Sequence, residues 1–406
     1  MARLSQASET LAIHGGQPVR RKPMPPRFGI GKAERAKIFE VLDYYREIGL
    51  DPGYQGHFEE LYCRSFTKFL GGGYADAVAT GTAAVFVALA ALELPEGSEV
   101  LVSPITDPGT LSAIILNRLT PRLVDAAPES FNIGPEQVTN RITNETRALI
   151  VVHLAGRAAA IDAIVTDACR RGIRIIEDCS QAHGATWKGR PVGTFGDIAC
   201  FSTMNRKAHI TSGSGGVVFS RDEGLFRKAL AHADRGKPRW AEDFDDRNPN
   251  TFLFPALNLH TDEISCAIGI ASLARIRDSI SRRLKFVRGV AEGLIGNSRV
   301  CAPYRWSDAD SPFIYPVLVN SDRLRCSKIE FAEAVRAEGI GLNPHYQYVA
   351  RDWPWLKPYL QDDFDTANAK RIRDSAFCLY LNENYGKQEI HDTLTAILKV
   401  ENHFLK

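Results

Sequence analysis

Two charged residues stand just after apolar runs that have the length of buried strands. Asp178 follows IRIIE at residues 173–177, and Lys207 lies in the loop after IACFS at residues 198–202. The carboxyl ends of parallel strands meet at one edge of a sheet, where ligands usually bind. We therefore expect Asp178 and Lys207 to face one crevice, close to the glycine cluster at residues 213–216.

A third feature, the pair Gly81 and Thr82, opens an alanine-rich segment that predicts a helix. Backbone N–H groups at a helix start attract anions such as phosphate. Taken singly, Thr82 and Asp178 suit helix or turn caps, and Lys207 suits a solvated loop. Together they supply what pyridoxal phosphate (PLP) requires: a lysine for its aldehyde, an acid for its ring nitrogen and an anion site. The combination predicts a PLP site.

The segments that must position these residues alternate between strands and helices. Strand-like runs such as EVLVS, ALIVVHL and GVVFS are separated by helical segments of about 10–14 residues. This pattern predicts an α/β fold with a mostly parallel central sheet that is covered on both faces. Neither GxGxxG nor GxxxxGK follows a strand, so the dinucleotide and nucleoside triphosphate fingerprints are absent.

We expect three parts along the chain. Residues 1–30 are rich in Gly and Pro and predict an N-terminal arm. Residues 31–255 contain the alternating pattern and predict a large PLP-binding domain. Residues 256–406 change to a strand, FIYPVLV, with helices near residues 328–337 and 388–400, which predicts a smaller α+β C-terminal domain.

The composition of the chain excludes several classes of function. A net charge of +2 gives no basic surface for nucleic acid, and no run of about 18 apolar residues suits a membrane span. The eight cysteines show no CxxC and no paired His/Cys spacing, so we expect neither a metal site nor disulfides. Scattered cysteines and the lack of a signal-peptide pattern favour a cytoplasmic protein.

Longer stretches of the chain resemble the DegT/DnrJ/EryC1/StrS family of sugar aminotransferases. The resemblance rests on LAIHGGQPVR, ATGTAAVFVALAAL, RLVDAAPESFNI, VVHLAG, EDCSQAHGATWKGRPVGTFGDIACFST and NLHTDEISCAIGIASL. The most specific part is EDCSQAHGA followed by GTFGDIACFS and a lysine six residues after Phe201. The resemblance implies the aspartate-aminotransferase fold and PLP as cofactor.

The resemblance also implies a role for each matching residue. Lys207 corresponds to the lysine that bonds to the cofactor aldehyde and moves protons, and Asp178 corresponds to the partner of the pyridinium nitrogen. Asn258 corresponds to a residue that reaches the phosphate from a neighbouring subunit, which implies a homodimer with shared sites. The other implied cofactor-binding residues are Gln181, beside the ring hydroxyl, and Gly81, Thr82 and Ser202, around the phosphate.

Some positions depart from the family pattern on the substrate side. Asp107, within SPITDPGT, stands where the family usually has an aromatic residue that stacks on the cofactor ring. His260 replaces an arginine, and Ser214 replaces an acid in the segment after the lysine. His183 lies in the matching motif, either beside the substrate or as a packed core histidine. We assign Asp107, His183 and His260 to the substrate side, so the substrate is expected to be atypical.

These features predict an aminotransferase that moves an amino group from glutamate or glutamine to a keto-sugar, most simply a nucleotide-linked one. Three alternatives stay open: amination of a keto-cyclitol, a PLP-dependent sugar dehydratase, and a PLP-binding regulatory protein without turnover. Dehydratases of the family have histidine in place of the lysine, and His209 lies close to Lys207 in the sequence.

Overall fold

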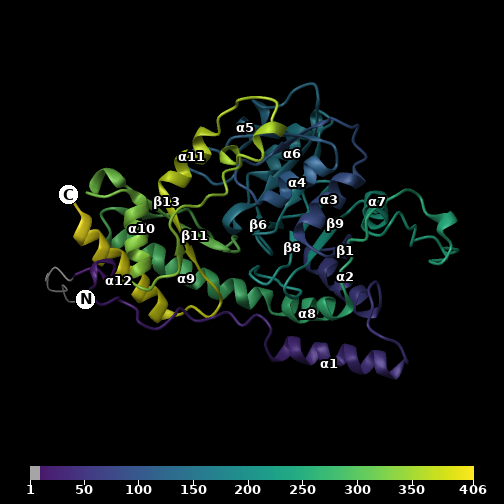
Figure 1. Ribbon diagram of the computed structural model, residues 1–406, viewed down its shortest axis with the longest axis horizontal. Helices are drawn as coiled ribbons and strands as arrows, with labels where there is room; N and C mark the ends of the chain where they lie inside the picture. The colour runs from purple at the N-terminus through teal and green to yellow at the C-terminus, as the bar shows by residue number, and fades with distance from the viewer. Residues whose placement is uncertain (1–9) are drawn as a thin grey trace.

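The computed structural model describes residues 10–406. Its larger part is built on a seven-stranded sheet with the order β1-β9-β8-β5-β4-β2-β3 (Figure 1). β9 runs antiparallel to both of its neighbours, whereas β3, β2, β4, β5 and β8 run parallel. The predicted α/β fold with a mostly parallel sheet is confirmed. The strands are β1 (Tyr74–Val78), β2 (Glu99–Val102), β3 (Thr120–Leu123), β4 (Thr146–Val152), β5 (Arg174–Asp178), β8 (Ile198–Ser202) and β9 (Gly216–Ser220).

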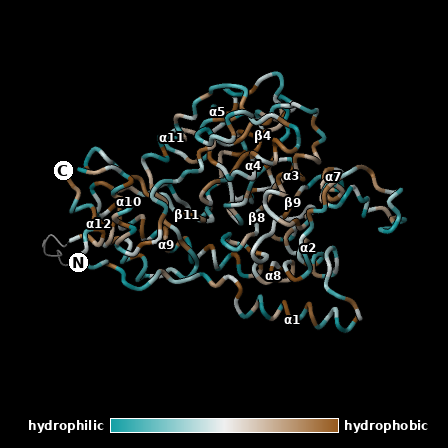
Figure 2. The backbone as a smooth tube through the Cα atoms, viewed as in Figure 1, coloured by the Kyte–Doolittle hydropathy of each residue, from teal (hydrophilic) through white to brown (hydrophobic). Residues whose placement is uncertain are grey.

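Helices cover both faces of this sheet. Alternate side chains of a strand point to opposite faces, so Ile150 packs with α3, α4 and α7 while Leu149 packs with α5 and α6. α2 and α8 cover the β1–β9–β8 end of that second face. Figure 2 shows hydrophobic segments gathered at β4, α3 and α4. These helices are α2 (His57–Leu70), α3 (Gly81–Ala91), α4 (Pro108–Leu116), α5 (Pro135–Thr139), α6 (Ile161–Arg170), α7 (Glu223–Ala233) and α8 (Glu263–Ala274).

A smaller antiparallel sheet with the order β10-β11-β13-β12 forms the core of the C-terminal part. Its strands are β10 (Cys301–Pro303), β11 (Ile314–Val319), β12 (Leu342–Asn343) and β13 (Ala376–Tyr380). The accompanying helices are α9 (Ile276–Asn297), α10 (Lys328–Ala337), α11 (Ala367–Asp374) and α12 (Lys387–Phe404). Short elements complete the chain: β6 (Thr186–Trp187), β7 (Arg190–Pro191), η1 (Ala12–His14), η2 (Leu154–Gly156), η3 (Pro249–Thr251), η4 (Ser321–Arg323), η5 (Ala350–Asp352) and η6 (Lys357–Tyr359).

The described portion of the predicted arm, residues 10–30, packs along the C-terminal part before it enters α1 (Lys32–Glu47) (Figure 1). Residues 1–9 of that arm lie outside the described residues. Leu11 is fully buried, and the backbone N–H groups of Ala12 and Val19 each donate to the Glu338 carboxylate at 2.9 Å. Arg20 pairs with Glu389 and Asp392 in α12. A Gly- and Pro-rich segment is therefore ordered by the surface beneath it.

The region around residue 256, where we predict a domain boundary, joins both parts of the molecule. α8 packs against α1 and α2, and α9 packs against α12 and β10. The division at residues 255 and 256 stays a prediction. Across residues 10–406, every helix is too short or too polar to cross a bilayer.

Candidate active site

Asp178 ends β5 at the edge of the sheet where β8 also ends. The two strands are parallel, with Asp178 paired with Cys200 in register. The Asp178 side chain is buried; its Oδ1 accepts a hydrogen bond from the backbone N–H of Ser180 at 3.0 Å. Its Oδ2 lies 3.4 Å from the donating hydroxyl of Thr110. Asp178 thus caps the turn at Ser180 with one oxygen and keeps the other toward α4.

Lys207 lies in the loop after β8, as predicted, and is half-buried. Its Nζ lies 4.6 Å from the centre of the Phe313 ring, which comes from the C-terminal part. Burial lowers the pKa of Lys207 below its usual value, and the negative charges of Asp178 and Asp107 oppose this shift. A lysine in such surroundings loses its proton more readily, which suits a nucleophile.

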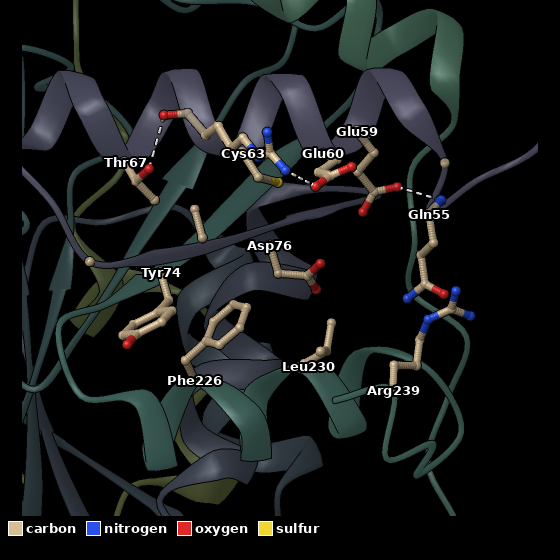
Figure 3. A pocket seen from close by; sticks show the side chains of 14 residues that line it. Gln55, Glu59, Glu60, Cys63, Thr67, Tyr74, Asp76, Phe226, Leu230 and Arg239 are labelled. Atoms are coloured by element: carbon tan, nitrogen blue, oxygen red, sulfur yellow. Dashed lines mark hydrogen bonds and ion pairs between the residues drawn. The ribbon is translucent and has the colours of Figure 1, made fainter. Parts of the chain in front are cut away.

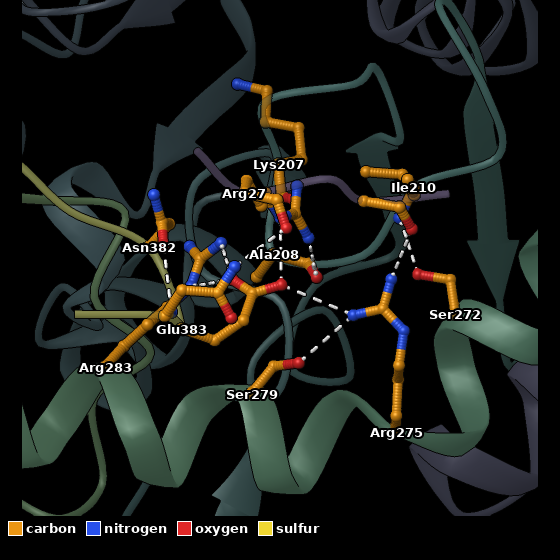
Figure 4. A network of polar contacts seen from close by, with 12 residues as sticks. Arg27, Lys207, Ala208, Ile210, Ser272, Arg275, Ser279, Arg283, Asn382 and Glu383 are labelled. Atoms are coloured by element: carbon orange, nitrogen blue, oxygen red, sulfur yellow. Dashed lines mark hydrogen bonds and ion pairs between the residues drawn. The ribbon is translucent and has the colours of Figure 1, made fainter. Parts of the chain in front are cut away.

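The backbone around Lys207 is held by an arginine of the N-terminal arm. Arg27 donates to the carbonyl oxygens of Asn205 at 3.0 Å and Ala208 at 2.9 Å, and also to that of Lys207. Glu383 in turn binds Arg27, with Nε to Oε1 at 2.9 Å. Figure 4 shows the Lys207 side chain extending away from this cluster. Arg27 therefore fixes the backbone of Lys207, while the amine of the side chain points away from Arg27 and Glu383.

The predicted phosphate site lies where α3 begins against the end of β8. A Cβ atom on Gly81 would lie 2.5 Å from Cβ of Ser202, so this close approach requires glycine. Thr80, not Thr82, caps the helix, accepting from the N–H of Ala83 at 2.8 Å. The hydroxyl of Thr82 takes no part in the cap, and the residue is exposed. Gly81, Thr82 and Ser202 thus meet at a helix N-terminus that can hold an anion.

The Gln181 side chain is oriented by a backbone group of the larger part of the molecule and by a tyrosine of the C-terminal part. Its Oε1 accepts from the N–H of Ala155 at 2.9 Å, and its Nε2 donates to the Tyr346 hydroxyl at 3.4 Å. Tyr346 is buried and its ring centre lies 5.0 Å from that of Tyr348. These two tyrosines and Phe313 are aromatic rings that the C-terminal part brings to this region, and no motif or spacing predicts their position.

His183 is a buried histidine next to this site. Neither of its ring nitrogens has a hydrogen-bond partner among the described residues. Burial, followed by the charge effects of His209 and Lys207, holds its pKa well below the usual value, so the ring is neutral. Its ring centre lies 5.6 Å from that of Phe201. The packing fits a core histidine whose two ring nitrogens have no partner among the described residues.

Asp107 has a structural role that the sequence analysis missed. It is the N-cap of α4, and its Oδ1 accepts from the N–H of Gly109 at 2.9 Å. Pro108 then occupies the first helical position, which Pro favours. The sequence signal for this cap was present in Asp-Pro-Gly before a helical segment. The carboxylate is exposed and close enough to Lys207 to influence its charge.

Asn258 and His260 follow each other on a segment beside β1. Asn258 is exposed, and its Oδ1 accepts from the N–H of His260 at 3.3 Å. The His260 ring contacts Gln55, Asp234 and the stacked ring of Tyr54. None of these neighbours is a predicted site residue. The substrate role of His260 stays a prediction. In the structure its ring lies in a polar cluster with Gln55 and Asp234.

The close contact at Gly81 gives a test of the anion site. In Gly81→Ala the added methyl must displace Ser202 or the start of α3, because its Cβ would lie 2.5 Å from that of Ser202. Overpacking of this kind costs about 1–3 kcal/mol, so we expect PLP affinity to fall about 10-fold or more. Fluorescence titration of the cofactor-free protein measures it. Gly296→Ala, with open space around its Cβ, is the control; unchanged affinity in Gly81→Ala would contradict the assignment.

Fold and site together define an aminotransferase-like α/β protein with a lysine, an acid and an anion cradle at one sheet edge. The chain belongs to the DegT/DnrJ/EryC1/StrS aminotransferase family, whose model matches residues 50–398. The predicted family membership is confirmed, and with it the prediction of a PLP-dependent aminotransferase.

Relatives match along most of the chain. A protein of Micromonospora echinospora, named as a candidate L-glutamine:3-amino-2,3-dideoxy-scyllo-inosose aminotransferase, is 29% identical over 98% of each chain. A protein of the same name from Streptoalloteichus tenebrarius is 32% identical over 86% of this chain and 85% of its own. GDP-perosamine synthase of Escherichia coli O157:H7 is 36% identical over 52% of this chain and 56% of its own.

Solved structures share the fold. The aminotransferase of Psychrobacter cryohalolentis matches with a TM-score of 0.86 at 26% identity, over 94% of this chain and 99% of that one. A sugar aminotransferase of Streptococcus pneumoniae, described in its PMP form, matches with a TM-score of 0.81 at 20% identity, over 94% of this chain and 98% of its own.

Proposed function

We propose that this protein binds PLP and transfers an amino group from glutamine or glutamate to the keto group of a polyhydroxylated ring. The observation that carries the proposal is the placement of Lys207 and Asp178 at one sheet edge, beside the anion cradle of Gly81 and Ser202. These residues fit the cofactor because a lysine amine suits its aldehyde, a carboxylate suits its ring nitrogen and a helix N-terminus suits its phosphate.

Different residues of the chain would contact different functional groups of the cofactor. When bound, PLP supplies an electron sink for the carbon that loses its proton. Lys207, whose pKa is lowered by burial, is the residue that would hold the cofactor aldehyde, and its amine would serve as the base that moves a proton. Asp178 would hold the protonated ring nitrogen. Gln181, held by Ala155 and Tyr346, would contact the ring hydroxyl.

A keto-cyclitol is the acceptor that the relatives support best. The two proteins named as inosose aminotransferases match 98% and 86% of this chain, whereas GDP-perosamine synthase matches 52%. A nucleotide-linked keto-sugar, the acceptor favoured by the sequence analysis, is the second candidate, supported by the 36% identity to GDP-perosamine synthase within that shorter region. Both candidates present a ketone on a hydroxylated six-membered ring.

The dehydratase alternative depended on His209, and its surroundings do not support that role. The ring is fully buried; its Nε2 lies 2.6 Å from the Tyr62 hydroxyl and its Nδ1 lies 3.2 Å from the Ser272 hydroxyl. Burial lowers its pKa to about 3. A neutral ring engaged on both sides in the core is a poor base for a substrate. The other alternative is a PLP-binding regulatory protein without turnover. The half-reaction assay described below distinguishes it from an aminotransferase.

We also propose that the active protein is a homodimer in which Asn258 serves the partner's site. Support comes from the exposure of Asn258 and of two leucines that precede it: Leu257 is 56% and Leu253 is 53% exposed. Apolar side chains this exposed mark interaction surfaces when they gather. Light scattering would show a mass of twice 44.9 kDa; a monomer at micromolar concentration would contradict the proposal.

The function is tested in two half-reactions. First, the PLP-loaded protein is mixed with L-glutamine or L-glutamate, and conversion of the cofactor to its amine form is followed by absorbance. Second, the amine form is mixed with a scyllo-inosose or with a nucleotide-linked 4-keto-sugar, and return of the aldehyde form is measured. We expect discharge by the cyclitol. Discharge by the nucleotide-linked sugar alone selects the second candidate, and no conversion with either donor contradicts the aminotransferase proposal.

A further inference from the structure

A cavity of about 330 Å³ lies between α2, β1 and α7. Figure 3 shows Asp76 of β1 and Glu59 of α2 beside it, with Gln55 and Arg239 at its side. Asp76 stands among the buried apolar residues of β1 and is 4% exposed, yet its Oδ2 has no hydrogen-bond partner within residues 10–406. A buried carboxylate oxygen without a hydrogen-bond partner is costly, so Oδ2 of Asp76 requires an explanation.

Two further groups face the same point. Glu59, 4% exposed, accepts from the backbone N–H of Gln55 at 2.7 Å with Oε2, and its Oε1 lies 4.0 Å from Nδ1 of His260. The His260 side chain is 1% exposed, and its Nδ1 has no partner in the described part of the chain. One ligand atom from each of Glu59, Asp76 and His260 lies within 4.8 Å of the other two.

The other side of the His260 ring fixes which nitrogen is free. Nε2 lies 3.5 Å from Oδ2 of Asp234 and 2.5 Å from the side-chain amide of Gln55, whose Oε1 has no partner. With that amide turned over, Oε1 accepts the proton of Nε2. Nδ1 then keeps its lone pair toward Glu59. Metal-binding histidines are held in the same way, by an acceptor on the nitrogen that does not bind the metal.

A second cluster of the same residue types shows the contrast. His153, Glu177 and Cys179 are also close together and buried. There, His153 Nδ1 accepts from the N–H of Ala159 at 3.1 Å and Nε2 lies 3.0 Å from Glu177, which also accepts from three backbone N–H groups. That cluster is satisfied by the protein alone. The cluster of Glu59, Asp76 and His260 is not.

Nearby cations do not neutralise the two acids directly. Lys237 lies 3.2 Å from Asp234 and 2.5 Å from Asp246, and Arg239 lies 3.9 Å from Asp234. Arg239 also lines the cavity, but within residues 10–406 no lysine or arginine lies within ion-pair distance of Glu59 or Asp76. The two acids therefore face a cavity of about 330 Å³ without a direct cationic partner.

We propose that Glu59, Asp76 and His260 bind a divalent cation of the zinc class, with water completing the coordination. Two carboxylate oxygens and one imidazole nitrogen are a ligand set that Zn²⁺ accepts at about 2.0–2.2 Å. The ion joins α2, β1 and the segment that carries Asn258. That segment is already attached to β1, since the N–H of Ala79 donates to Leu259 at 2.7 Å. The site does not depend on the proposed function.

The test measures metal rather than activity. Metal-stripped full-length protein is titrated with Zn²⁺ by calorimetry, and its melting temperature is recorded with and without the ion. We expect one equivalent to bind to the wild type and raise the melting temperature. Asp76→Asn, which keeps the side-chain shape, and His260→Gln are expected to weaken binding of that equivalent at least about 100-fold. Glu60→Gln, an exposed acid next to Glu59, is the matched control.

Cysteine is the main competing ligand, because Cys63 lines the same cavity and Cys169 is exposed. Co²⁺ in place of Zn²⁺ separates the cases, since thiolate ligation adds a charge-transfer band that oxygen and nitrogen ligands lack. The proposal is supported if Co²⁺ binds to the wild type without that band and if Asp76→Asn no longer binds Co²⁺. Equal uptake by wild type and both variants, a thiolate band, or no uptake by the wild type would overturn it.

Discussion

Lys207→Ala is expected to lower kcat for amino transfer about 10⁴-fold or more, because one residue supplies both the bond to the cofactor and the proton transfer. The fold and the anion cradle are expected to remain, since the backbone of residue 207 is held by Arg27 and not by its own side chain. PLP affinity is therefore expected to fall much less than kcat. Half-reactions with glutamine, followed by absorbance, measure the rate.

A chemical readout separates loss of the lysine from loss of structure. After borohydride reduction, mass spectrometry of peptides is expected to find the cofactor attached to Lys207 in the wild type and to no residue in Lys207→Ala. Lys188→Ala, a surface lysine with 71% of its side chain exposed, serves as control and is expected to behave as the wild type. Attachment at another lysine, or full activity of Lys207→Ala, would contradict the assignment.

The parts of the site that could be predicted are those with a local signal. Asp178 and Lys207 follow apolar strands, and strand ends at a parallel sheet edge meet by topology alone. The start of α3 could also be predicted from the sequence, although the residue that caps the helix is Thr80 and not Thr82. At Asp107, the sequence Asp-Pro-Gly is itself a helix-start signal, and the N-cap role explains why an acid stands where the family usually has an aromatic residue.

The contacts that complete the site join residues far apart in the sequence. Arg27 and Glu383 are separated by 356 positions, and Gln181 and Tyr346 by 165. No periodicity or spacing indicates such pairs, because only the docking of the arm and the C-terminal part brings them together. The end of the short strand β12, Leu342–Asn343, also has a specific cause. Pro344 follows, and the Asn343 side chain accepts from the N–H of His345 at 3.0 Å, which ends the ladder.

The second large effect is expected at Glu383, which joins three arginines. Its Oε1 lies 2.9 Å from Arg27 and 3.3 Å from Arg275, and its Oε2 lies 2.9 Å from Arg283. The Arg283 side chain is 1% exposed, so Glu383→Gln leaves a buried cation without its carboxylate. Removing one partner of a buried pair costs about 3–5 kcal/mol. We expect a loss of that size in urea unfolding, and less than about 0.5 kcal/mol for the exposed control Glu40→Gln.

The pH dependence of stability gives an independent check on this network. Burial opposes ionisation of Glu383, but Arg283 and Arg27 outweigh it and hold its pKa at about 2, below the usual 4.5. A carboxylate with a lowered pKa contributes stability above its unfolded pKa, and that contribution is lost as the pH falls through the folded value. The wild type should therefore lose stability more steeply than Glu383→Gln between about pH 4.5 and pH 2. Parallel curves for the two proteins would mean that solvent, not the carboxylate, neutralises these arginines. In that case the Lys207 loop would owe its position to Arg27 alone.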